Sequence, residues 1–165
     1  MTTQSLNTAQ TWALLICFLS GALLSGALYF EFVLGLAPCP LCMMQRIWFV
    51  LTALTAYVSL LHSPRLGIYP LLSFIFAAIG GYFSSRQLWL QSLPEDQVPA
   101  CGPDLQYMLE VFPLGDVLVA MTQGTGDCAQ TAWSFVGVTL PGWALIGFVA
   151  IAVCAFLQLK TGLKR

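Results

Sequence analysis

Four of the six cysteines form two pairs whose spacing could support thiol chemistry. Cys39 and Cys42 form a C-x-x-C pair, a spacing found in zinc half-sites, redox dithiols and structural bridges. Cys101 and Cys128 form a second, widely separated pair. A four-cysteine zinc site usually repeats the short spacing, and no His lies near either pair. We therefore expect no metal site, and each pair is interpreted as a redox or a structural disulfide.

Cys42 falls where a helix is expected to begin, so its sulfur should lie near the positive end of that helix. Such a position favours a thiolate. Arg46 follows four residues later on the same helical face, where its guanidinium could lie beside the sulfur. An interfacial Arg that only reaches toward headgroups is the alternative. Because an ionisable residue this close to a membrane-embedded thiol is a functional candidate, we predict that Arg46 belongs to the site.

Cys101 and Cys128 lie in an acidic segment rich in Pro and Gly, away from the expected helix starts. From spacing alone, a disulfide that staples this segment to itself and a redox disulfide both remain open. Two disulfides on one membrane face could pass electrons by thiolate attack through mixed disulfides. Cys17 and Cys154 lie inside apolar stretches, where cysteine usually serves as a small apolar side chain.

The composition indicates whether these cysteines belong to a soluble protein or to a membrane protein. Of the 165 residues, 58% are hydrophobic and 8% are charged, whereas soluble domains carry about 25% charged residues. The mean hydropathy is +0.82. Disorder is excluded by this hydrophobicity, and six basic residues in a chain of net charge −1 cannot form a nucleic-acid footprint. The chain is therefore expected to be one integral membrane domain, residues 1–165.

Three uncharged apolar stretches are long enough to cross a bilayer, which needs about 20 residues. A fourth, Ile47 to Leu61, reaches that length only if its helix begins near Leu41 and includes Arg46. The fold class that they predict is an all-α membrane protein, a four-transmembrane-helix bundle with a long outer loop. The absence of Lys and Arg before Arg46 argues against a cleaved signal peptide at the first stretch. The predicted spans are approximately 12–34, 41–61, 66–85 and 141–159, and the predicted outer loops are 35–40 and 86–140.

The long loop contains a predicted short amphipathic helix. Apolar side chains recur at i, i+3, i+4 and i+7, a pattern typical of a helix that could lie on the membrane surface. Pro113 and Gly115 should end or kink it. The pattern consists of Leu105, Met108, Leu109 and Phe112.

Basic residues predict the orientation of the bundle. Lys160, Lys164 and Arg165 cluster after the last span, and Arg65 lies in the short link between the second and third spans. Because short loops rich in Lys and Arg stay in the cytoplasm, both termini are expected there. Both cysteine pairs then face the oxidising outer compartment, where disulfides persist.

Several motifs in this order resemble one family of membrane thiol oxidases. They are residues 38–46 (PCPLCMMQR), 87–91 (QLWLQ), 99–103 (PACGP), 126–129 (GDCA) and 141–143 (PGW). Together they resemble the disulfide bond formation protein B (DsbB) family of bacterial inner-membrane proteins. The resemblance covers nearly the whole chain and extends to the order, spacing and topology of the motifs.

The resemblance implies a protein-disulfide:quinone oxidoreductase. Cys39 and Cys42 would be the pair coupled to a membrane quinone, ubiquinone or menaquinone, with Cys42 beside it and Arg46 helping to bind and polarise it. Cys101 and Cys128 would oxidise a periplasmic, thioredoxin-like dithiol carrier (DsbA-like), with Cys101 attacked in the mixed disulfide. The protein would be a multi-pass protein of the bacterial inner membrane with periplasmic cysteine loops.

The chain departs from the family pattern in one segment. Some members carry a His near the quinone within the part that matches residues 87–92, and this chain has none there. The resemblance therefore assigns no quinone-binding side chain to that segment. Two other functions remain as alternatives: a non-catalytic membrane scaffold braced by disulfides, and an oxidase of the same fold dedicated to one special thiol substrate.

Overall fold

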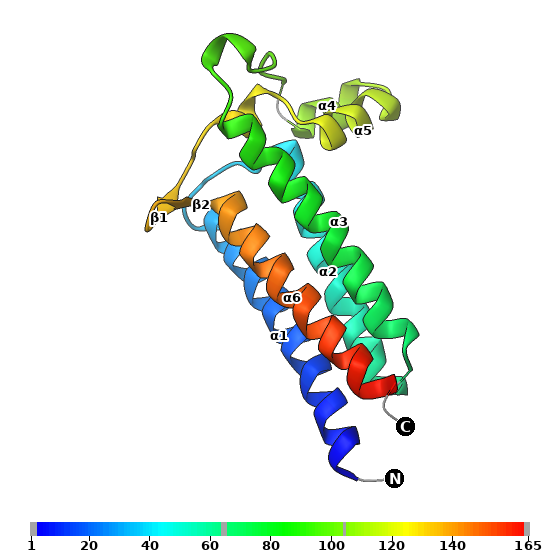
Figure 1. Cartoon of the computed structure of the whole chain (residues 1–165). Coiled ribbons are helices and arrows are strands. Elements are labelled where there is room, and N and C mark those ends of the chain that lie inside the picture. Colours follow the sequence, from blue (N-terminus) through cyan, green and yellow to red (C-terminus); the bar gives the residue numbers. More distant parts are fainter. Residues whose placement is uncertain (1–2, 64–65, 104, 164–165) are drawn as a thin grey trace.

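Four long helices form a bundle in the computed structural model, which describes residues 3–63, 66–103 and 105–163 (Figure 1). They are α1 (Thr3–Phe32), α2 (Pro40–His62), α3 (Ile68–Gln91) and α6 (Leu140–Leu163). Over these described ranges, four helices are long and apolar enough to cross a membrane. Helix α1 packs against α2 and α6, and α3 packs against the same two helices. The predicted fold class is confirmed.

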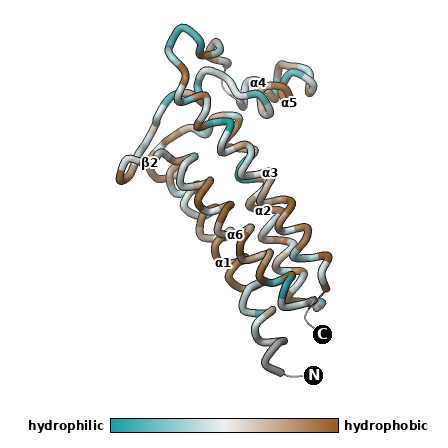
Figure 2. The backbone as a smooth tube through the Cα atoms, in the orientation of Figure 1, coloured by the Kyte–Doolittle hydropathy of each residue, from teal (hydrophilic) through white to brown (hydrophobic). Residues whose placement is uncertain are grey.

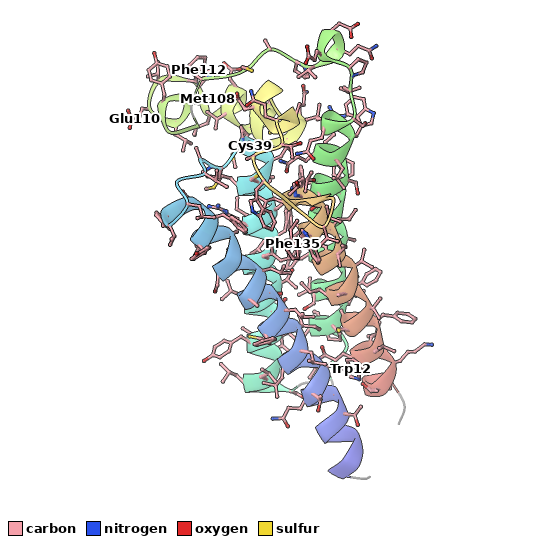
Figure 3. All side chains as sticks on the ribbon, turned by 90° about the vertical axis from the view of Figure 1, so that its left-hand side faces the viewer. Trp12, Cys39, Met108, Glu110, Phe112 and Phe135 are labelled. Carbon is pink, nitrogen blue, oxygen red and sulfur yellow. The ribbon has the colours of Figure 1, made fainter. Side chains whose placement is uncertain are left out.

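The connections divide the bundle into two unlike ends. The α1–α2 and α3–α6 connections lie together at one end, which we call the loop end, and α1 starts and α6 finishes at the other (Figure 1). Cys39, Met108 and Phe112 are near the loop end, whereas Trp12 is near the opposite end (Figure 3). Of the orientation signals, Arg65, Lys164 and Arg165 lie outside the described residues.

Helix α3 extends beyond its predicted end at residue 85 and continues to Gln91. The buried face of the helix continues past Arg86, and Leu90 on this face packs in a cluster with Leu41 and Phe83. The helix ends only shortly before Pro94, because a proline disfavours helical backbone in the residue that precedes it. The structure thus corrects the predicted loop 86–140, whose first six residues, 86–91, belong to α3.

The core of the bundle is built from close ring stacking and small residues. The rings of Phe49 and Phe148 stack with centroids 3.9 Å apart and an interplanar angle of 4°. Gly80 allows α3 to approach α6, because a Cβ there would lie 2.3 Å from the Phe148 ring. Small residues at helix crossings are typical of membrane bundles. Most residues of the long helices are hydrophobic, whereas the connection after α3 at the loop end contains a strongly hydrophilic stretch (Figure 2).

The long connection after α3 contains more structure than predicted. The predicted amphipathic helix is present as α4 (Leu105–Val111) and ends before Pro113. Met108 packs with Val117 and Ala120 in a small cluster of its own. The other elements were not predicted from the sequence. They are α5 (Leu114–Gln123), the short helices η1 (Glu95–Gln97) and η2 (Gly126–Ala129), and an antiparallel hairpin of β1 (Ser134–Phe135) and β2 (Val138–Thr139).

Candidate active site

The C-x-x-C pair opens helix α2. Cys39 is the N-cap, with extended backbone (φ −71°, ψ 163°), and Pro40 occupies the first helical position, where its missing N–H costs nothing. The N–H of Met43 donates to the Cys39 carbonyl at 3.2 Å. Cys42 therefore lies in the first turn, and the two Sγ atoms are 3.1 Å apart. Both sulfurs lie at the positive end of the helix.

Cys128 joins this pair from the distant loop. It is fully buried on η2 and packs in one cluster with Leu41 and Leu90. Its thiol has a pKa below the usual value because Cys39 donates a hydrogen bond to its sulfur, as does the backbone N–H of Leu41 at the start of α2. Three of the four predicted cysteines are thus in one place. Throughout the described part of the chain, no group of three or more His, Cys, Asp or Glu side chains is arranged to hold a metal ion.

Cys101, the fourth predicted cysteine, has the opposite environment. Its side chain is exposed, and the carboxylate of Asp127 beside it raises the pKa of its thiol. The two segments of the long connection that carry Cys101 and Cys128 touch through their backbones, since the N–H of Gly126 donates to the carbonyl of Ala100 at 3.1 Å. Of this second pair, one sulfur is therefore open to a partner and the other is turned toward Cys39.

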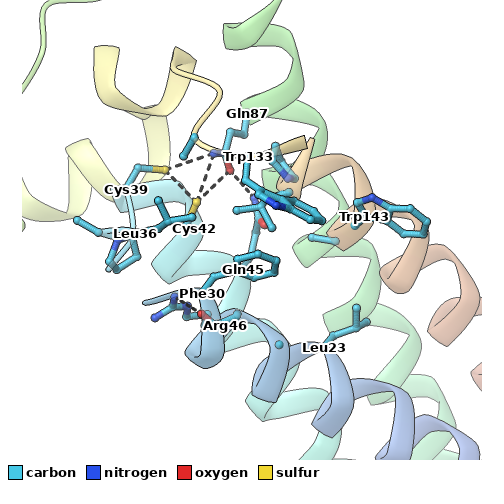
Figure 4. Close-up of a pocket in the computed structure, with 18 of the residues that line it drawn as sticks. Leu23, Phe30, Leu36, Cys39, Cys42, Gln45, Arg46, Gln87, Trp133 and Trp143 are labelled. Atoms are coloured by element: carbon cyan, nitrogen blue, oxygen red, sulfur yellow. Dashed lines mark hydrogen bonds between the residues drawn. The ribbon is translucent and has the colours of Figure 1, made fainter. Parts of the chain in front are cut away.

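Gln87 connects α3 to both sulfurs of the first pair. Its Nε2 lies 3.3 Å from Cys42 Sγ and 3.4 Å from Cys39 Sγ. Its Oε1 accepts a hydrogen bond of 2.8 Å from Nε2 of Gln45 on α2 (Figure 4). Neither amide was predicted from the sequence to belong to the site. A signal was present for Gln45, because a polar side chain inside a predicted membrane span is a functional candidate, whereas Gln87 fell outside the predicted spans.

Arg46 lines the same region but is directed toward α1. Its guanidinium forms an ion pair with Glu31 through Nη1, and Nη2 donates to the Ala27 carbonyl at 3.0 Å. Nη1 also lies 3.7 Å from the sulfur of Met43. The side chain is 14% exposed, so it lies within the protein and is paired there. Glu31 was also missed, although a carboxylate within an apolar helix end was a usable signal.

A cavity of about 450 Å³ opens beside the sulfurs (Figure 4). Its polar lining includes Cys39, Cys42, Gln45, Arg46 and Gln87, together with Gln91, Asp127 and Gln130 at its edge toward the long connection. Aromatic rings line the rest: Phe30 and Trp133 have centroids 4.7 Å apart, and Trp133 stacks on Phe135 of the hairpin at 6.0 Å. A mostly apolar cavity with a few converging polar groups is typical of small-molecule sites.

A four-helix membrane bundle that gathers three thiols at one helix start belongs to the class of membrane disulfide oxidoreductases. Comparison with known proteins gives the family. The family model described as "Disulfide bond formation protein DsbB" matches residues 9–158, and the chain belongs to this family.

Curated relatives agree with this assignment. A disulfide bond formation protein B of Hahella chejuensis is 50% identical over 150 residues, covering 88% of this chain and 91% of the relative. The protein of the same name from Methylococcus capsulatus is 46% identical over 157 residues, covering 93% and 96%. "Disulfide bond formation protein B 1" of Pseudomonas aeruginosa is 44% identical over 140 residues, covering 83% and 86%. No solved structure matches the chain.

Proposed function

We propose that this protein reoxidises a periplasmic, DsbA-like dithiol carrier and passes the electrons to a membrane quinone, and that it thereby sustains disulfide bond formation. The observation that carries the proposal is the packing of Cys128 and Cys39 in one buried cluster, which links the two cysteine pairs. The protein lies in the bacterial inner membrane with both termini in the cytoplasm and the loop end in the periplasm. The positive tail supports this orientation.

The first exchange takes place at Cys101. A carrier thiolate attacks Cys101 Sγ, a carrier–Cys101 disulfide forms, and the Cys101–Cys128 bond breaks with its electron pair on Cys128. Exchange is faster when the leaving sulfur has the lower pKa. The backbone N–H of Leu41 stabilises the Cys128 thiolate, and the carboxylate of Asp127 raises the pKa of Cys101, so both sulfurs favour this direction. The exposed Cys101 is also the sulfur that a protein partner can reach.

The second exchange joins the two pairs. The Cys128 thiolate attacks Cys39 Sγ, so a Cys39–Cys128 bond forms and the Cys39–Cys42 bond breaks with its electron pair on Cys42. The second carrier thiolate then attacks the carrier sulfur of the mixed disulfide, which releases the oxidised carrier and the Cys101 thiolate. Attack of Cys101 on Cys128 restores their disulfide and leaves Cys39 and Cys42 reduced.

The cavity beside Cys42 suits a quinone, ubiquinone or menaquinone. Its aromatic walls, including Phe30 and Trp133, can hold a flat ring, and Gln45 and Arg46 provide hydrogen-bond donors at one side. The chemistry that a bound quinone supplies is the acceptance of two electrons and two protons, which leaves Cys39 and Cys42 as a disulfide again. The lipid-soluble acceptor would reach this pocket within the membrane.

The test is quinone reduction by the purified protein with a reduced periplasmic dithiol carrier as electron donor. Cys101→Ala should block transfer from the carrier but leave quinone reduction by a small dithiol. Cys42→Ala should abolish quinone reduction with either donor, whereas Cys17→Ala serves as the matched control. If wild-type protein reduces no quinone with any donor, the proposal is wrong and a disulfide-braced scaffold explains the chain. Reduction only with one special thiol protein would replace the general carrier.

A further inference from the structure

The amide of Gln87 directly contacts both sulfurs of the C-x-x-C pair, at 3.3 Å from Cys42 and 3.4 Å from Cys39 (Figure 4). Its side chain is only 3% exposed, so water does not compete for these hydrogen bonds, and a bond in such surroundings is electrostatically stronger than in water. The exchange steps described above make no use of this amide.

Gln45 determines which way the amide points. A glutamine side chain has one oxygen that accepts and one nitrogen that donates two hydrogen bonds. Gln45 Nε2 donates to Gln87 Oε1 at 2.8 Å, which fixes Oε1 as the acceptor and leaves Nε2 closest to both sulfurs. The neutral Cys42 thiol can also donate to Oε1, at 3.6 Å, but a Cys42 thiolate can only accept, and then from Nε2. Gln45 is itself buried, 5% exposed. The donor geometry is therefore present before any reaction.

We propose that Gln87 is a catalytic residue that stabilises the sulfur anion released on Cys42, and that Gln45 is a positioning residue for it. The inference rests on the proposed function, in which Cys128 attacks Cys39 and the electron pair of the broken Cys39–Cys42 bond goes to Cys42, with no proton transferred. A thiolate accepts a hydrogen bond far better than a disulfide sulfur does. The interaction therefore strengthens as charge develops, which is the condition for catalysis by a preorganised donor.

The neighbouring cation does not perform this task by contact. The guanidinium of Arg46 is bonded to Glu31 and to the Ala27 carbonyl, both on α1. The carboxylate of Glu31 compensates much of its charge. In the reduced pair the Cys39 thiol also donates to the Cys42 sulfur, at 3.1 Å. In the exchange step Cys39 is bonded to Cys128 and has no S–H, so the side-chain donor to Cys42 is then Gln87, which is neutral and adds no charge to the membrane interior.

The experiment measures the rate at which iodoacetamide alkylates Cys42, because only the thiolate is alkylated. The protein is the full chain with Cys17, Cys101, Cys128 and Cys154 replaced by Ala, reduced and purified, at one pH, with the modified residue identified by mass spectrometry. Gln87→Met, of similar length but without the amide, should lower the rate about ten- to hundred-fold. Unchanged alkylation in this variant would overturn the proposal and leave Gln87 as a link between α2 and α3.

A second variant tests the positioning role. Gln45→Met should lower the alkylation rate by less than Gln87→Met does. The double variant should be no slower than Gln87→Met alone, because the effect of Gln45 acts through the same amide and such neighbours are not additive. If the two losses add, Gln45 does not act through Gln87, and that part of the proposal fails.

Gln158→Met is the matched control. Gln158 is also a buried glutamine of a long helix, 1% exposed, and it donates to Ser59 at 3.1 Å, away from the sulfurs. Its variant should alkylate at the parent rate. If Gln87→Met does not fold, Gln87→Glu replaces it, since its acceptor oxygens facing the sulfur should slow alkylation further, and a parent rate there refutes the role equally. The measurement uses neither quinone nor carrier, so it can succeed or fail independently of the proposed function.

Discussion

Gly126 lies where the segment that carries Cys101 meets the segment that carries Cys128. We expect Gly126→Ala to separate these two cysteines. A Cβ built at Gly126 would lie 2.4 Å from the Pro99 carbonyl oxygen and 3.0 Å from the Cys101 backbone nitrogen. Both of these atoms are backbone, so neither can move aside by changing a rotamer. An ordinary contact needs at least 3.4 Å, so the loops must move apart by about 1 Å in this variant.

The size of the effect follows from these contacts. Overpacking of this kind costs about 1–3 kcal/mol, and weakening the bond from the Gly126 N–H to Ala100 adds about 0.5–1.5 kcal/mol. The overpacking alone should lower the equilibrium constant for bringing the two segments together by about 5- to 150-fold. Disulfides accept only a narrow range of separations between the two Cα atoms, so we expect the equilibrium constant for forming the Cys101–Cys128 bond to fall by a similar factor.

The assay is redox titration of Cys101 and Cys128 against a defined thiol–disulfide buffer, in protein whose Cys39 and Cys42 are replaced by Ala. Free thiols are trapped with a maleimide and counted by mass spectrometry. Gly115→Ala is the control, because a Cβ there meets nothing within 4 Å, and its titration should match that of the parent. An unshifted titration in the Gly126 variant would refute the reasoning that close backbone approach holds the pair together.

Three further predictions concern other parts of the molecule. Asp127→Asn removes the carboxylate that raises the pKa of Cys101. The pKa of Cys101 should therefore fall and its thiolate fraction at a fixed pH near 8 should rise, so its alkylation should be several-fold faster. Asp127→Glu, the control, should stay close to wild type. Gly80→Ala places a Cβ 2.3 Å from the stacked ring of Phe148 and should lower the free energy of unfolding by about 1–3 kcal/mol. Thermal unfolding in detergent measures this loss. Gly21→Ala is the control, because its Cβ meets nothing within 4 Å and should leave the free energy of unfolding unchanged. Arg46→Lys loses the planar fork of donors that binds two groups on α1; purified, normalised protein should show a KM for quinone raised about ten- to hundred-fold, and wild-type kinetics in an uncharged variant would remove Arg46 from the site.

Much of the bundle could be predicted from the sequence because membrane spans are a local property. Each span is a contiguous apolar stretch, and its length is dictated by the bilayer. The start of α2 is equally local, since Pro40 suits the first helical position and brings Cys39 and Cys42 to the helix start. The order of the cysteine motifs was sufficient to recognise the family, which the matching family model confirms.

The end of α3 shows where local patterns misled the prediction. The uncharged stretch ends before Arg86, so the span was expected to end at residue 85. In the structure Arg86 remains helical, and its side chain lies over the ring of Trp89 and donates to the carbonyl of Gln123 at 3.3 Å. Packing of Leu90 against α2 then favours continued helix beyond the charge. Gln87 was consequently assigned to a loop, and its contact with the sulfurs was not foreseen.

The assembly of the site was decided only by tertiary structure. The sequence determined that Cys39 and Cys42 share a helix start, because residues three positions apart in a first turn must be neighbours. It could not determine that Cys128 turns toward Cys39, or that Glu31 pairs with Arg46. Those contacts depend on how a loop and the end of another helix pack against α2. Packing between segments distant in the chain arises from the sum of many small contacts, and no single local pattern in the sequence records that sum.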